Sequence, residues 1–130
     1  MKLDLDKKGL EMALPPWQLE LMRWIWNTDR EIDTRAAYNH LQESPTPMSR
    51  ASAINFLNKM AEEGYLIYRE TTTKGGHKRL YKPSPTTPDE DAFRRVLAKR
   101  VVGRVLEEIA TNRADKEEKE IEEGQEDQNI

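Results

Sequence analysis

Two strand-like segments stand on either side of a turn that contains Gly75 and Gly76, and they limit the folds open to this chain. The segments "YLIYRET" and "KRLYKP" are rich in β-branched and aromatic residues, and with a glycine turn between them they predict a two-stranded antiparallel hairpin. An isolated hairpin is only marginally stable in water. The hairpin must therefore pack against other elements, which the rest of the chain has to supply.

Two helices are predicted in the first third of the chain. The segment "LPPWQLELMRWIWNTDRE" carries apolar residues at helical spacing behind two prolines, which suit a first helical turn, and it should stop at 27–29. A shorter helix, capped by Asp33 or Thr34, should follow and end near Gln42, before the prolines of "SPTP".

A third helix is predicted directly before the hairpin. Ser49 is a suitable N-cap, and Gly64 stands where a helix end favours a left-handed residue. The order is then three short helices followed by a two-stranded ribbon. This order is typical of a winged helix-turn-helix, so we expect an α+β, mainly α, fold in which the hairpin is the wing.

The segment after the hairpin predicts a long helix and an acidic tail. Thr87 and Pro88 resemble a helix start, and apolar periodicity continues to about Asn112. Residues 114–130 contain eight acids and two basic residues, so we expect a disordered tail or frayed helix there. The expected organisation is an N-terminal extension (1–14), a winged-helix domain (15–83), a dimerisation helix (84–113) and a tail (114–130).

The third helix and the hairpin carry side chains suited to double-stranded DNA. In a helix-turn-helix the second helix of the pair enters the major groove, where Arg and Asn read base edges and Ser and Lys hold phosphates. The inner side of the 49–63 helix should consist of Ala53, Leu57, Met60 and Ala61, whereas Phe56 is placed between core and rim. The predicted DNA-binding residues are Ser49, Arg50, Ser52, Asn55, Asn58, Lys59, Lys74, Gly75, His77, Lys78 and Arg79.

Other interpretations of the same residues remain open. Polar residues on an exposed helix more often than not form only a solvated face, and a Lys-rich hairpin tip can serve solubility and protect a sheet edge. The alternatives are a winged-helix protein-interaction module, whose surface would include Trp24 and the long helix, and a low-specificity chromatin or plasmid-replication DNA-binding protein.

Several segments resemble the penicillinase and methicillin-resistance repressors and, more loosely, the multiple-antibiotic-resistance-type regulators. "LMRWIW" resembles their first helix, "SRASAINFLNKMAEEGYLIYRE" their recognition helix, and "KRLYKPSPTTPDED" their outgoing wing strand. The resemblance implies a small dimeric repressor that reads a palindromic operator, with Ser49, Arg50, Ser52, Asn55 and Lys59 at the recognition positions. Copper-responsive relatives carry C-terminal cysteines, and this chain has no cysteine, so metal derepression is not expected.

The apolar arc of the long helix is wider than one stripe, which favours a partner surface. We expect a homodimer, because symmetric dimers are the commonest assembly, although the helix could instead fold back on its own domain. The predicted dimerisation residues are Phe93, Val96, Leu97, Val101, Val105 and Ile109.

Composition and the N-terminal sequence indicate where the protein is located and which functions are not expected. The chain lacks cysteine, a charged N-terminal segment stands where a signal peptide would be apolar, and no apolar run approaches the length of a membrane span. We therefore expect a cytoplasmic protein with no membrane contact. No nucleophile–base pair or phosphate-binding glycine loop is evident, so no enzyme activity, metal or cofactor is expected. The operator, the effector and the sign of regulation are not predictable from these residues.

Overall fold

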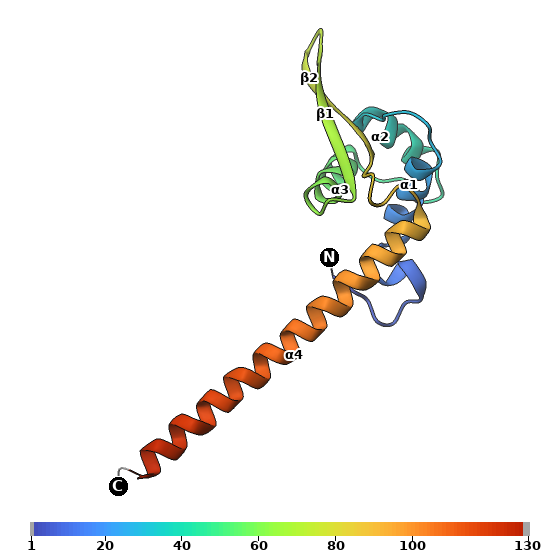
Figure 1. Cartoon of the computed structure of the whole chain (residues 1–130). Coiled ribbons are helices and arrows are strands. Elements are labelled where there is room, and N and C mark those ends of the chain that lie inside the picture. Colours follow the sequence, from blue (N-terminus) through green and yellow to red (C-terminus); the bar gives the residue numbers. More distant parts are fainter. Residues whose placement is uncertain (1, 129–130) are drawn as a thin grey trace. The chain divides into compact units, whose positions relative to one another are not determined.

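The hairpin and the helices expected from the sequence are present in the computed structural model (Figure 1). The structure describes the backbone of residues 2–128 and the side chains of residues 2–111. These residues form four α-helices, a short 3-10 helix and one two-stranded antiparallel sheet. The elements are η1 (Gly9–Met12), α1 (Pro16–Trp26), α2 (Thr34–Gln42), α3 (Arg50–Glu62), β1 (Leu66–Thr73), β2 (Gly76–Pro83) and α4 (Glu90–Gln128).

Local capping explains where α2 and α3 begin. Asp33 accepts a hydrogen bond from the Ala36 N–H at 2.8 Å, and Ser49 accepts one from the Ser52 N–H at 3.1 Å. Each side chain satisfies a backbone donor that the first helical turn leaves unpaired. Gly64 follows α3 with a φ of +84°, a conformation that favours glycine, so the chain can turn sharply into β1.

The hairpin pairs from Leu66 opposite Pro83 to Thr73 opposite Gly76. Lys74 and Gly75 form the turn, and Gly76 takes the positive φ, at +127°. Ile32, between α1 and α2, adds one antiparallel bridge to Tyr81, with N–H···O distances of 2.9 and 2.7 Å. The base of the hairpin is therefore tied to the helices, whereas its turn projects beyond α2 and α3 (Figure 1).

The core lies in residues 1–94, which form one compact unit; residues 95–130 form a second. Side chains from α1, α2, α3, the hairpin and the start of α4 are fully buried in the first unit, among them Leu21, Leu41, Leu57 and Tyr81. Phe56 is also buried, so it belongs to the core and not to a rim, whereas Ala61 is only half-buried.

The N-terminal segment also contributes to this core, which its sequence pattern does not reveal. Leu10, Ala13 and Leu14 are buried, and η1 holds them in place. The Ala13 and Leu14 N–H groups both donate to the Leu10 carbonyl, at 3.0 and 2.9 Å.

The start of α4 differs from the expectation in two ways. Asp89 is the residue that caps it, accepting from the Ala92 N–H at 2.8 Å, while Thr87 is buried and donates to the Tyr65 carbonyl at 3.1 Å. Phe93 was predicted at a dimer interface, but it is fully buried within the first unit, against Trp26 and Tyr65. Because it is already covered within one chain, Phe93 acts as a core residue.

The described backbone of α4 remains helical to Gln128, beyond the end expected near Asn112. The side chains of the predicted acidic tail lie outside the described residues, so its disorder stays a prediction. Among the described residues, no helix is long and apolar enough to cross a membrane.

Candidate nucleic-acid interface

The exposed face of α3 is polar and partly basic. Arg50, Asn55 and Lys59 are exposed, while Ala53 and Leu57 on the same helix are fully buried. Ser49 is exposed at the N-terminus of the helix, and its Oγ lies 2.9 Å from the Oγ of the half-buried Ser52. Because the buried residues fix the rotation of α3, its first turn and its cationic side chains face away from the core.

Asn58 connects α3 to the hairpin. Its Oδ1 accepts hydrogen bonds from the Tyr81 hydroxyl at 2.5 Å and from Arg79 Nη1 at 3.2 Å. Asn58 is half-buried, and Tyr81 is only 1% exposed. Asn58 was predicted among the DNA-binding residues, but its side-chain amide oxygen is directed at the hairpin. Asn58 thus sets the position of the hairpin relative to α3.

Arg79 lies beside this junction. Its guanidinium stacks over the Tyr68 ring at 4.3 Å from the centroid, and its Nε lies 3.7 Å from Glu70 Oε1. Its interaction with Tyr81 is the main reason that the pKa of Arg79 is raised above its usual value. The side chain is 41% exposed, so a permanently charged group is held on the hairpin face that contacts Asn58 of α3.

The opposite face of the hairpin holds a different set of charges. Lys78 Nζ lies 3.2 Å from Asp33 Oδ2, and Arg69 Nε donates to Glu31 Oε2 at 2.8 Å. Burial alone would raise the pKa of Asp33, but the hydrogen bonds from the Ala36 N–H and Lys78 outweigh it and lower the pKa. Alternation along a strand separates Lys78 from Arg79, so the predicted wing residues do not share one face.

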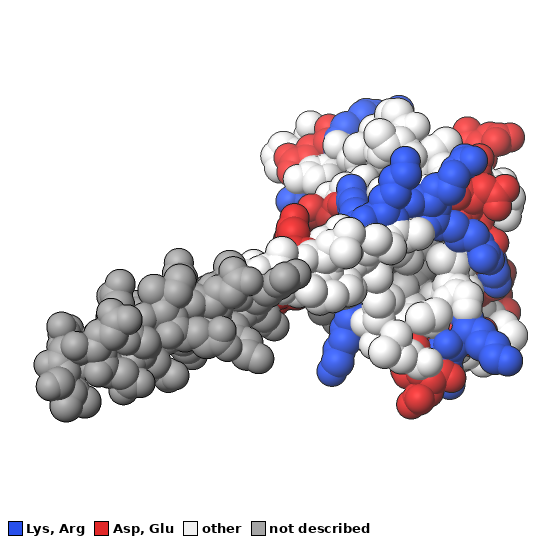
Figure 2. All heavy atoms as spheres, turned by 60° about the horizontal axis from the view of Figure 1, so that its bottom comes forward, with Lys and Arg blue, Asp and Glu red and all other residues white. Residues whose placement is uncertain are grey.

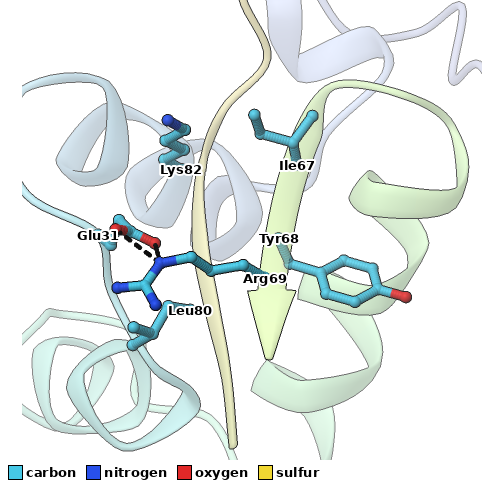
Figure 3. Close-up of a pocket in the computed structure, with 6 residues that line it drawn as sticks. All are labelled: Glu31, Ile67, Tyr68, Arg69, Leu80 and Lys82. Atoms are coloured by element: carbon cyan, nitrogen blue, oxygen red, sulfur yellow. Dashed lines mark hydrogen bonds and ion pairs between the residues drawn. The ribbon is translucent and has the colours of Figure 1, made fainter. Parts of the chain in front are cut away.

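A shallow hollow lies on this second face, lined by Glu31, Ile67, Tyr68, Arg69, Leu80 and Lys82 (Figure 3). Figure 3 shows Arg69 reaching across the hairpin to Glu31, while the Tyr68 ring points to the other side, where Arg79 stacks on it. The hollow is therefore separate from the surface formed by α3 and Arg79.

Apart from Asn58, which contacts the hairpin, the predicted interface residues fall into three groups. The first lies on the outer face of α3: Ser49, Arg50, Ser52, Asn55 and Lys59. The second lies on the adjoining strand face or at the turn: His77, Arg79, Lys74 and Gly75. The third is Lys78, which faces α2. Figure 2 shows one face of the molecule, on which several Lys and Arg side chains lie next to one another and Asp and Glu side chains lie around them.

Trp24, the residue assigned to the alternative protein-interaction surface, already has a neighbour. Its ring stacks on His40, with centroids 4.5 Å apart and planes 12° apart, and His40 Nε2 lies 3.2 Å from Glu20 Oε1. One face of the indole is therefore covered within the chain. Among the side chains that the structure describes, no three His, Asp or Glu residues lie together so as to hold a metal ion.

Two residues that support the candidate interface residues were not predicted from the sequence. Tyr68 supports the Arg79 guanidinium, and Tyr81 orients Asn58. The strand register that pairs Tyr68 with Tyr81 could have suggested an aromatic pair, because directly opposed side chains share a face. Their contact with α3 depends on how the hairpin docks, which the register does not determine.

Comparison with solved structures finds the same fold in another protein. A possible transcriptional regulator from Methanosarcina mazei Go1 matches with a TM-score of 0.53, over 73% of this chain and 78% of that chain, at 21% identity. A PadR-family transcriptional regulator from Eggerthella lenta DSM 2243 matches with a TM-score of 0.46, over 70% of this chain and 80% of that chain, at 14% identity. No protein-family model and no curated protein matches this chain.

At 21% identity, the likeness to the Methanosarcina protein shows a shared fold of helices and a two-stranded sheet. Membership of the penicillinase and methicillin-resistance repressor family, which the sequence motifs suggested, stays a prediction.

Proposed function

We propose that this chain is a winged-helix, sequence-specific DNA-binding transcriptional regulator, and that it acts as a dimeric repressor on a palindromic operator. In this proposal α3 enters the major groove and the hairpin is the wing that contacts the adjacent backbone. The fold shared with a possible transcriptional regulator supports the regulatory class.

The single observation that carries the proposal is the Asn58 junction. It ties the hairpin to the side of α3 whose neighbouring residues Arg50, Asn55 and Lys59 are exposed. Any two-stranded hairpin needs a packing partner, but this hairpin packs beside the exposed polar residues of α3. A DNA-recognition helix and an adjoining hairpin that contacts phosphates need a fixed relative position, because base and phosphate contacts must be made together.

Specific roles follow from side-chain chemistry. Arg50 can pair with guanine and Asn55 with adenine, while Lys59 neutralises phosphate. Ser49 and Ser52 lie at the N-terminus of α3, where a phosphate oxygen is favoured. On the wing, Lys74, His77 and Arg79 supply donors, and Gly75 lets the turn approach the DNA backbone closely. Lys78 is left out of this contact, because its ammonium group lies 3.2 Å from Asp33 on the other face of the hairpin.

The α4 residues Val96, Leu97, Val101, Val105 and Ile109 form the dimer contact in this proposal. Phe93 is left out of it, because that side chain is buried in the first unit. A dimer would present two reading helices about one DNA turn apart, in keeping with a palindromic operator.

The test is selection of binding sites from random duplex DNA, followed by gel shifts with Arg50→Ala and Asn55→Ala on the enriched site. Each substitution should cost roughly 1–3 kcal/mol and relax discrimination at one base pair. Arg69→Ala is the matched control, because it removes a cation that faces away from α3 and is paired with Glu31. Equal losses for all three variants would refute sequence reading by α3.

Salt dependence separates this function from its rivals. A steep decline in affinity between 50 and 200 mM salt, together with a preferred sequence, supports the regulator. A steep decline with no preferred sequence would instead identify a low-specificity chromatin or plasmid-replication protein. Absence of any DNA binding at 50 mM salt would leave the protein-interaction module.

A further inference from the structure

The middle of α4 carries an exposed apolar stripe. Val102, Val105, Leu106 and Ile109 are 58%, 50%, 60% and 60% exposed. Their spacing of three, one and three residues places all four on one side of a helix. A contiguous row of large, water-exposed apolar side chains is unusual on a protein that acts alone, and it marks a surface that another element covers.

Charge is segregated along the same helix. Residues 94–104 contain five basic residues (Arg94, Arg95, Lys99, Arg100 and Arg104) and no acid. Residues 107–127 contain ten acids and three basic residues, a net charge of −7. The stripe lies where the sign of the charge changes, so its two ends are flanked by opposite charges.

From these two observations we infer that α4 pairs with α4 of a second copy of this chain in an antiparallel orientation, along the stripe. In a parallel pair the basic half of one helix would lie against the basic half of the other, and the acidic halves would also meet. Antiparallel pairing centred on the stripe places residues 94–104 beside the partner's residues 107–117, which contain four acids and two basic residues, while the apolar stripes still face each other. The inference rests on the proposed dimer and adds its orientation.

The described ion pair at the end of the basic half is exposed to solvent. Arg104 forms an ion pair with Glu108 one turn later at 3.1 Å, with side chains 75% and 58% exposed. Exposed pairs of this kind contribute little, so exchanging a partner within the helix for one across the dimer costs little. The apolar stripe supplies the affinity in this arrangement, whereas the charges decide the orientation.

The orientation can be measured by electron paramagnetic resonance between spin labels, with line broadening in continuous-wave spectra for short distances and pulsed dipolar measurements for long ones. The full chain contains no cysteine, so a single substitution gives one label per copy. The stripe is centred between Val105 and Leu106, so labels on Arg95→Cys should be separated by about 30 Å along the axis in an antiparallel pair. In a parallel pair they should lie at the same level, on axes roughly 8–10 Å apart.

Glu107→Cys is the control, because that position lies close to the centre of the stripe and should give a short distance in either orientation. A short distance at 107 with a long one at 95 is the expected result. Short distances at both positions would overturn the antiparallel orientation, and the absence of a dipolar signal at 107 would overturn pairing through α4.

A second experiment probes the charges without a label. Exchanging the sign of the basic half with Arg95→Glu and Lys99→Glu should raise the dissociation constant of the dimer in sedimentation experiments at low salt, and added salt should reduce the difference. An unchanged or lower dissociation constant would contradict the charge argument. Both experiments are done without DNA, so failure to bind DNA leaves them unaffected, and a parallel dimer would leave the DNA-binding proposal intact.

Discussion

Replacing Asn58 by alanine should destabilise the protein through a residue that the sequence presents as a surface polar group. The substitution removes the oxygen that accepts from the Tyr81 hydroxyl at 2.5 Å and from Arg79 Nη1 at 3.2 Å. Tyr81 is 1% exposed, so its hydroxyl has little access to water as a substitute partner. Arg79 is partly exposed and can be hydrated, so most of the cost should come from Tyr81.

The magnitude follows from the asymmetry of hydrogen bonding. A typical intramolecular hydrogen bond contributes only about 1 kcal/mol net, but leaving a buried partner unsatisfied costs about 1–3 kcal/mol. We therefore expect Asn58→Ala to lower the free energy of unfolding by about 1–3 kcal/mol. Tyr81→Phe in the Asn58→Ala background should then cost much less than Tyr81→Phe in the wild type, because the hydroxyl has already lost its partner.

The assay is urea denaturation of the two single variants and the double variant, which gives the coupling free energy between the side chains. Coupled neighbours typically show 0.5–3 kcal/mol of non-additivity, and we expect a value of about 1 kcal/mol or more here. Asn55→Ala is the matched control: it is the same substitution on the exposed face of the same helix, and its effect should stay within about 0.5 kcal/mol. Additive effects of Asn58→Ala and Tyr81→Phe would refute the junction.

Three further substitutions test other parts of the structure. Asp33→Ala should lower the free energy of unfolding at pH 7 by about 0.5–2 kcal/mol through loss of the α2 cap. Because the folded-state pKa of Asp33 lies below its ordinary value of 3.8, this contribution is complete above pH 3.8. This contribution should be lost as the pH falls through the lower folded-state pKa of Asp33. If the difference in free energy of unfolding between wild type and variant grew as the pH fell, the role of Asp33 as the α2 cap would be contradicted. Phe93→Ala should lower the free energy of unfolding, measured by urea denaturation, by about 3–5 kcal/mol at every protein concentration, because the ring is buried within one unit. If the loss varied with protein concentration, Phe93 would belong to the dimer interface after all. Gly103→Ala should stabilise α4 by about 0.5–1 kcal/mol, because alanine favours a helix over glycine and an added methyl group would meet no atom within 4 Å. Thermal melting followed by circular dichroism should therefore show a higher melting temperature. A lower melting temperature would mean that another surface occupies that space.

The helix and strand boundaries were predictable because their signals are local. Ser49 and Asp33 cap helices through hydrogen bonds to residues three positions later, and Gly64 ends α3 by its own backbone conformation. The hairpin turn needs only its glycine at positive φ and two strand-forming segments. Each of these features is complete within a few residues, so the sequence alone contains enough information to place it.

Side-chain roles were less predictable because they depend on partners distant in the sequence. Helical spacing places Phe56 between core and rim, whereas its packing against Trp17 makes it a core residue; the two rings lie 5.5 Å apart in an edge-to-face arrangement. Asn58 was grouped with Asn55 by residue type, but only the docking of Tyr81 distinguishes them. Helical periodicity gives the direction in which a side chain points, whereas the element that it meets depends on the tertiary fold.

The apolar ladder of α4 shows how one periodic pattern can serve two purposes. Phe93, Leu97, Val101, Val105 and Ile109 recur every four residues, which predicted one continuous contact surface. Exposure rises along the ladder from 0% at Phe93 to 50% at Val105 and 60% at Ile109. The first residue therefore anchors the start of α4 in the core of residues 1–94, while the last two need cover from elsewhere. A continuous apolar pattern therefore does not require a single partner surface. The reversal of charge along α4, which apolar periodicity does not report, supports the proposed second partner, α4 of another copy of the chain.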